Sequence, residues 1–265
     1  MFLPHCERRD GRQSKSMFDL PLASLLIIAL TFFLAGIVKG VTGMGLPTVA
    51  MGILGTIMPP AGAAALLLVP SFVTNVLQLL SGPSFAALAL RLWAMMLAIL
   101  LGTIAGSWLM ANDTAGWTTM GLGAALMIYA GYSLMARQLS VPRNLEPLLS
   151  PLIGVITGVV TGATGVFVIP AVPYLQSLGL TKDDLIQALG LSFTVSTIAL
   201  GVGLTSGGAL QLDSLSTSTL ALAPALLGMW CGQKVRNAIS PTSFRRWFLI
   251  CLLLLGLELV LKQLF

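Results

Sequence analysis

A lysine stands among glycines near the end of the first long apolar run of the sequence. The stretch GIVKGVTGMGLP, residues 36–47, contains Lys39, four glycines, Thr42 and a closing proline. A charged side chain inside an apolar segment costs free energy and therefore indicates a functional site by default. An ammonium beside glycine N–H groups and a threonine forms a set of donors that suits an anion. The alternative is that Lys39 snorkels from a helix end to the membrane interface.

A second stretch repeats this pattern in the other half of the chain. GVITGVVTGATGVFVIP spans residues 154–170. We align Lys39 with Thr157, and Thr42 with Thr161, one inserted residue later. Glycines, threonines and a following proline disfavour one straight helix, so we expect a broken helix in each stretch. The second half of a broken helix offers unpaired N–H groups and a partial positive charge to an anion.

Polar residues at helical spacing accompany the two glycine stretches. Ser71 and Asn75 are four residues apart, on one face of a helix, and Ser192 and Ser196 repeat that face in the second half. Such residues can also be interhelical hydrogen-bonding partners that serve packing alone. Their recurrence in both halves favours the lining of a cavity. The predicted substrate-binding residues are Lys39, Gly40, Thr42, Gly43, Gly45, Ser71, Asn75, Thr161, Gly162, Thr164, Gly165, Ser192 and Ser196.

The residues that carry enzyme or metal chemistry are scarce. The single histidine, His5, lies in the polar N-terminal stretch, and the three cysteines have no motif spacing. Among the acidic residues only Glu258 lies within an apolar run, which disfavours a carrier of cations. We therefore expect neither an enzyme nor a metal site nor a cofactor.

The composition indicates that the protein is surrounded by lipid. Of 265 residues, 56% are hydrophobic and 9% are charged, whereas soluble domains carry roughly 25% charged residues. In lipid only helices and closed barrels satisfy their own backbone groups, and the continuous apolar runs favour helices. The net charge of +5 is spread over short loops, which indicates membrane topology rather than nucleic-acid binding.

The apolar segments fall into two groups of five. A polar N-terminal tail covers residues 1–17, the first repeat residues 18–136, a connecting loop residues 137–150 and the second repeat residues 151–265. Met17 is an alternative translation start. The expected segments are 20–38, 45–58, 61–80, 88–110, 117–136, 151–162, 165–178, 184–205, 215–233 and 244–264. A full span needs roughly 20 residues, so 45–58, 151–162 and 165–178 are expected to be half-helices or re-entrant pieces.

Further matches indicate an internal duplication. Ser71-Phe72 matches Ser192-Phe193, and the pair Gly102 and Gly106 matches Gly228 and Gly232. We expect the two Gly-x-x-x-Gly pairs to serve close helix packing. Repeats with an odd number of crossings are inverted relative to one another, a plan known from secondary transporters. The predicted fold is therefore an all-α polytopic membrane protein with two repeats of about four to five transmembrane segments each, inverted, with broken or re-entrant helices.

With these residues identified, the sequence resembles the sulfite exporter TauE/SafE family of bacterial inner-membrane transporters. The resemblance rests on GIVKGVTGMGLP, on GVVTGATGVFVIPAVPYL and on the Gly-x-x-x-Gly pairs, and it covers nearly all of residues 20–264. It implies a multi-pass protein that exports sulfite, an organosulfonate or a related small anion. Ala163, Thr164 and Val166 stand where family members often have further glycines.

The expected function is export of a small anion by alternating access, with the lipid bilayer and the anion as partners. No nucleic acid is expected as a partner. A second copy of the chain, in a homodimer, is a further candidate partner. An anion channel on the same duplicated frame, or a transporter of a carboxylate or another organic anion, remains open at this point.

Overall fold

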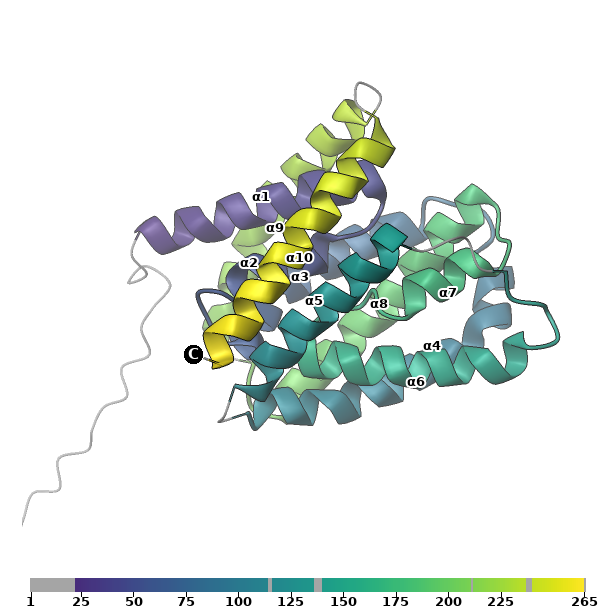
Figure 1. Ribbon diagram of the computed structural model, residues 1–265, viewed down its shortest axis with the longest axis horizontal. Coiled ribbons are helices and arrows are strands. Elements are labelled where there is room, and N and C mark those ends of the chain that lie inside the picture. Colours follow the sequence, from purple (N-terminus) through teal and green to yellow (C-terminus); the bar gives the residue numbers. More distant parts are fainter. Residues whose placement is uncertain (1–21, 114–115, 136–139, 211, 237–239, 265) are drawn as a thin grey trace, which may run out of the picture.

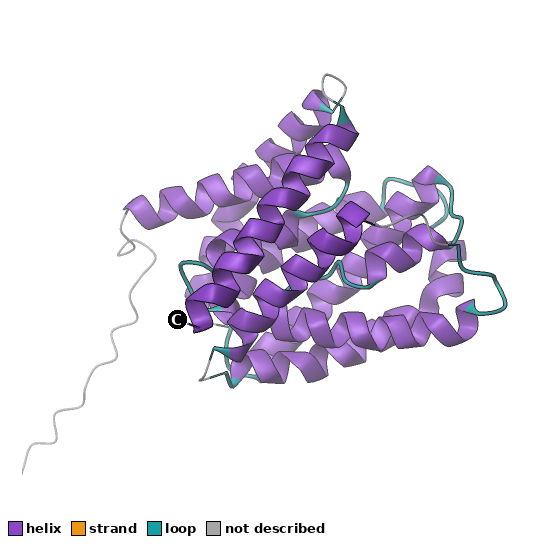
Figure 2. Cartoon of the chain, viewed as in Figure 1, coloured by secondary structure: helices purple, strands orange, loops and turns teal. Residues whose placement is uncertain are grey.

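The described part of the chain consists of helices joined by short loops (Figure 2). The computed structural model describes residues 22–113, 116–135, 140–210, 212–236 and 240–264, and these contain ten helices and no strand. The predicted tail 1–17 and the start of the predicted connecting loop lie outside the described residues. The helices are α1 (Leu22–Thr42), α2 (Leu46–Leu54), α3 (Pro60–Leu79), α4 (Phe85–Ala111), α5 (Trp117–Met135), α6 (Glu146–Thr164), α7 (Ala171–Ser177), α8 (Lys182–Ser206), α9 (Leu212–Val235) and α10 (Pro241–Leu264).

Each predicted apolar segment corresponds to one helix. Two short helices, α2 with 9 residues and α7 with 7, are too short to cross a bilayer, as expected for half-helices. The prediction for 151–162 was wrong, because α6 has 19 residues and begins at Glu146. Pro147 occupies its first turn, where the missing N–H would have no partner within the helix anyway.

Seven described helices are long and apolar enough to cross a membrane, namely α1, α3, α4, α6, α8, α9 and α10. The first half thus contributes three candidate spans and the second half four. Among the described residues, α5 has 19 residues but is not a candidate span. The chain is therefore a multi-pass membrane protein.

Glycines let the helices of one half approach those of the other. A Cβ added at Gly232 in α9 would stand 2.3 Å from the carbonyl oxygen of Ile37 in α1, and one at Gly106 in α4 would stand 2.5 Å from that of Val159 in α6. Such contacts exist only where no side chain intervenes. The packing role predicted for the two Gly-x-x-x-Gly pairs is confirmed. Figure 1 shows α4 and α6 side by side along their length.

In two other helix pairs, α3 with α8 and α5 with α10, the two helices of the pair run in opposite directions. Along α3 and α8, Leu68 lies beside Gly201, whereas Leu79 lies beside Gly190. Along α5 and α10, which lie together in Figure 1, Gly123 meets Gly256. Gly116, just before α5, lies against Gln263 near the end of α10. In each pair the residue numbers rise along one helix and fall along the other, so both pairs are antiparallel.

A proline inside α3 is accommodated by a hydroxyl from α9. Pro70 has no N–H, so it cannot bond to the carbonyl of Leu66 one turn earlier. Ser218 Oγ donates to the Leu66 carbonyl at 2.7 Å and accepts from the Val69 N–H at 3.1 Å. The hydroxyl thus replaces the missing intrahelical partner and connects the two halves of the chain at this point.

Candidate functional site

Each half contains a helix that stops at a threonine followed by a glycine. α1 ends at Thr42, and Gly43 and Gly45 adopt φ angles of 77° and 103° before α2 begins. α6 ends at Thr164, and Gly165 has a φ angle of 72°. Residues with a side chain rarely adopt such positive φ angles, so glycine permits both breaks. The two predicted broken helices are confirmed.

The two breaks share a hydrogen-bonding pattern that corrects their alignment. Thr42 Oγ1 donates to the carbonyl one turn earlier and accepts the N–H two residues later, and Thr164 does the same. The amide of Gly43 bonds to the Lys39 carbonyl, and that of Gly165 to the Thr161 carbonyl. Lys39 therefore corresponds to Thr161. The predicted pairing with Thr157 was wrong by one helical turn.

Two of the predicted binding glycines lie inside helices. Gly40 in α1 packs against α9, where an added Cβ would stand 2.3 Å from the Met229 carbonyl oxygen. Gly162 in α6 packs in the same manner against the Thr103 carbonyl oxygen of α4, also at 2.3 Å. Both glycines contact neighbouring backbone, so their position gives them a packing role instead of a place in the break.

The helix that follows the first break contacts the second break. Gly165 stands against the Met51 side chain of α2, where an added Cβ would be 2.8 Å from Met51 Cε. Phe167, which follows Gly165, packs on Phe193 of α8 with ring centroids 6.2 Å apart. Both rings and Met51 are fully buried. The first break is thus followed by a helix that touches the second break.

Lys39 is buried, with 4% of its surface exposed. Its Nζ donates to Thr74 Oγ1 at 3.1 Å and to Asn75 Oδ1, both on α3. No carboxylate of the described residues pairs with it. Because an ammonium has three protons, one donor is left without an acceptor among the described residues. The position of Lys39 in the last turn of α1 also lets the helix dipole stabilise its charge.

Asn75 connects Lys39 to the second half of the chain. While its Oδ1 accepts from Lys39, its Nδ2 donates to Thr197 Oγ1 of α8 at 3.2 Å. Thr197 Oγ1 in turn donates to the Phe193 carbonyl at 2.7 Å. Lys39 and Asn75, which were predicted together, are therefore joined directly. Thr74 was missed, although it lies three residues after Ser71, a helical spacing that could have identified it.

Three predicted hydroxyls are buried without a hydrogen-bond partner in the part of the chain that the structure describes. They are Ser71 on α3, and Ser192 and Ser196 on α8. A buried polar group without a partner is costly and calls for a ligand, a water or a rearrangement. Ser71 lies one turn before Asn75, and Ser196 precedes Thr197. The helices joined by the Asn75–Thr197 bond thus also carry the unpaired hydroxyls.

The predicted threonines of the breaks are already engaged by the backbone. The one hydroxyl proton of Thr42 is shared between the Val38 and Met44 carbonyls, at Oγ1–O distances of 2.9 and 2.6 Å. Thr161 Oγ1 donates to the Thr157 carbonyl at 2.7 Å, and Thr164 Oγ1 donates to the Val160 carbonyl at 2.6 Å. Together with the positive φ angles of Gly43, Gly45 and Gly165 they shape the breaks. Their hydroxyl protons are not available to a ligand in this conformation.

The family model described as sulfite exporter TauE/SafE matches residues 28–259 of the chain. The chain belongs to the sulfite exporter TauE/SafE family. No similar curated protein and no similar solved structure was found. The match covers both helix breaks, Lys39 and the polar faces of α3 and α8. Membership of the TauE/SafE family makes the chain a transporter for anions in a membrane, and the resemblance seen in the sequence is confirmed.

Proposed function

We propose that this TauE/SafE protein exports sulfite or a small organosulfonate through a site centred on Lys39. The observation that supports this most is the uncompensated charge of Lys39 at 4% exposure. A buried cation without a carboxylate partner is stable only if polar groups solvate it or an anion joins it. Thr74 and Asn75 supply two such groups, and an anion would complete the set.

The surrounding donors fit an anion with several oxygens. Ser71, Ser192 and Ser196 each have a hydroxyl proton without an acceptor among the described residues. A sulfite or sulfonate group has three oxygens and can accept from several donors at once. Gly45 caps α2 without a side chain, so the first N–H groups of that helix add positive potential beside the break.

The closed state of the site favours a carrier over an open channel. Asn75, Ser192 and Ser196 are each 0% exposed, so water does not reach them in this conformation. A carrier that opens to one side at a time passes through such a closed state, whereas a conducting channel keeps its lining hydrated. Alternating access is the mechanism that agrees with this burial.

An inverted repeat would supply the moving parts. Equivalent helices of inverted repeats run antiparallel, and α3 with α8 and α5 with α10 have that relation. Also in support, α1 packs on α9 as α6 packs on α4, so that in both cases the first helix of one half packs on the fourth helix of the other. Rocking of one repeat against the other would separate α3 from α8 and expose Lys39. The bacterial inner membrane, where the family resemblance points, is the proposed location.

A binding experiment tests this proposal on purified protein. We expect sulfite and methanesulfonate, but not sodium or potassium ions, to raise the thermal unfolding temperature. Saturation a hundredfold above the Kd corresponds to about 2.7 kcal/mol of stabilisation. Lys39→Gln, which keeps a polar side chain without the charge, should abolish the shift.

The matched control is Lys262→Gln. Lys262 lies at the exposed end of α10 and donates to the Thr56 carbonyl, far along the chain from the break residues. This variant should keep the parental shift. If Lys39→Gln retains it as well, Lys39 does not bind the anion, and the proposed site is wrong.

A further inference from the structure

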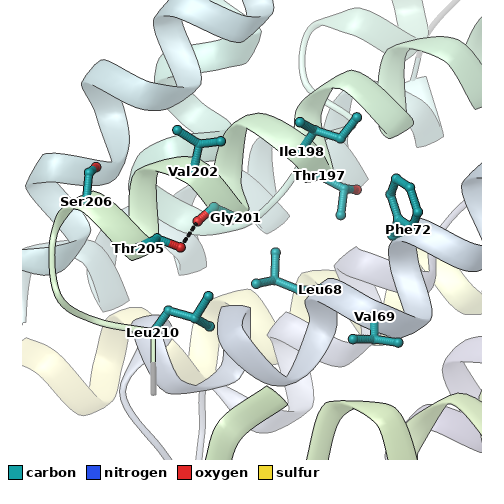
Figure 3. A pocket seen from close by; sticks show the side chains of 10 residues that line it. All are labelled: Leu68, Val69, Phe72, Thr197, Ile198, Gly201, Val202, Thr205, Ser206 and Leu210. Carbon is teal, nitrogen blue, oxygen red and sulfur yellow. Dashed lines mark hydrogen bonds between the residues drawn. The ribbon is translucent and has the colours of Figure 1, made fainter. Parts of the chain in front are cut away.

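An apolar groove runs between α3 and α8 (Figure 3). Its volume is about 630 Å³. The side chains that line it are Leu68, Val69, Phe72, Thr197, Ile198, Gly201, Val202, Thr205, Ser206 and Leu210. Most of this lining is hydrocarbon, and the hydroxyls lie near its two ends: Thr197 at one, and Thr205 with Ser206 at the other. The groove thus follows α8 from its middle toward its C-terminal end.

The inner end of the groove meets the hydrogen bonds that lead to Lys39. Thr197, which lines the groove, accepts from Asn75 Nδ2, and Asn75 accepts from Lys39. Two hydrogen bonds through the Asn75 side chain thus link Thr197, which lines the groove, to the buried ammonium. Nine residues of α8 separate Thr197 from Ser206, which corresponds to about 14 Å of helix.

We propose that this groove binds the apolar tail of an organic anion whose charged head is held at Lys39. This inference rests on the proposed function and narrows its substrate to alkyl or aryl sulfonates. A volume of 630 Å³ lies in the range of small-molecule pockets, and a sulfite ion would leave most of it empty. A tail that enters the groove leaves water, which is favourable for hydrocarbon. The head gains the attraction of the Lys39 ammonium and hydrogen bonds from the donors beside Asn75.

A lipid acyl chain is the competing occupant of an apolar groove in a membrane protein. The polar residues distinguish the two occupants. An acyl chain would gain nothing from the ammonium beyond Asn75. A substrate that joins an anionic head to a tail matches the polar inner end and the apolar wall together. Thr205 and Ser206, at the outer end of the groove, are exposed, and their hydroxyls bond to carbonyls of α8.

Gly201 offers a way to fill the groove without changing its polar end. A Cβ at this position would be 3.7 Å from the Leu68 side chain, an ordinary van der Waals contact. Gly201→Leu therefore places hydrocarbon in the space proposed for the tail. Gly131→Leu in α5 is the matched control, because nothing lies within 4 Å of an added Cβ there.

The experiment measures the affinity of the purified protein for straight-chain sulfonates from methanesulfonate to hexanesulfonate, with sulfite alongside. We expect affinity to rise about fourfold for each buried methylene in the parent and in Gly131→Leu. Gly201→Leu should bind methanesulfonate as the parent does and lose most of the gain for butanesulfonate and longer chains.

Two results would overturn this inference. One is equal affinity for all chain lengths in the parent, and the other is an unchanged chain-length dependence in Gly201→Leu. If Gly201→Leu instead alters only the dependence of stability on the acyl length of the lipid, the groove holds lipid. The Lys39→Gln variant distinguishes the failure of one proposal from the failure of the other. If methanesulfonate binding depends on Lys39 but affinity does not change with chain length among the sulfonates, only the tail site in the groove is wrong. Binding that is independent of Lys39 contradicts the proposed function itself.

Discussion

At the scale of single residues, the charge of Lys39 depends on two side chains of α3. Thr74 and Asn75 accept its hydrogen bonds, and Asn75 also extends to Thr197. In a low dielectric, breaking such an arrangement on one side leaves an uncompensated charge. Replacement of the whole arrangement by apolar groups removes that penalty. We therefore expect the effects of substitutions at Lys39 and Asn75 on the free energy of unfolding to be strongly non-additive.

Asn75→Ala should destabilise the protein by about 3 kcal/mol, because Lys39 loses an acceptor while it stays buried. The double variant Lys39→Met with Asn75→Leu should recover most of that loss. Equilibrium unfolding in mixed micelles measures both, together with the single variants Lys39→Met and Asn75→Leu that complete the double-mutant cycle. Thr205→Val is the control, since its exposed hydroxyl bonds only to its own helix. Additive effects of the two substitutions would show that the Lys39–Asn75 contact carries no coupling.

The sequence alone identified Lys39, Asn75 and the three unpaired serines. Charge inside an apolar run and polar residues four apart are visible without a structure, because helical periodicity places them on one face. Thr74 was not predicted, although its spacing of three residues from Ser71 was visible in the sequence. The register of the repeats was also missed. Glycines recur every four residues at Gly154, Gly158 and Gly162, so an alignment one turn away matches almost as well.

At the scale of helices, backbone contacts at glycines hold the halves together. α4 and α6 approach so closely that a Cβ at Gly158 would stand 2.6 Å from the Ile99 carbonyl oxygen. Between membrane helices the driving force is packing, so this proximity is a main source of association. The sequence predicted the elements because apolar runs and proline positions set their limits. It placed the start of α6 too late, because the stretch 137–147, with two prolines and mixed charge, was interpreted as a loop.

Gly158→Ala should destabilise the protein by about 1–3 kcal/mol, because the methyl group forces α4 and α6 apart. Gly131→Ala in α5 is the matched control, with nothing within 4 Å of the added Cβ. There the better helix propensity of alanine should stabilise by up to about 1 kcal/mol. Thermal unfolding in one detergent compares both variants. Equal and small effects would mean that the α4–α6 contact does not need glycine.

At the scale of the whole molecule, the polar residues of the site come from both halves of the chain. Lys39 and Asn75 belong to the first half, and Thr197, Ser192 and Ser196 to the second. Thr161 occupies the position equivalent to Lys39, so the site is similar in backbone at its two breaks and carries one positive charge. A single charge between the two halves agrees with the proposed binding and release of one small anion.

Export of sulfite from proteoliposomes tests this account most directly. The parent should show saturable efflux that external sulfite accelerates by counter-flow, as expected of a carrier. Lys39→Ala should lower the efflux rate at subsaturating sulfite by about a hundredfold, the effect of removing a buried charge from its ion. Efflux from Lys39→Ala at the parental rate, with protein correctly folded by its unfolding temperature, would contradict the claim that Lys39 carries the anion.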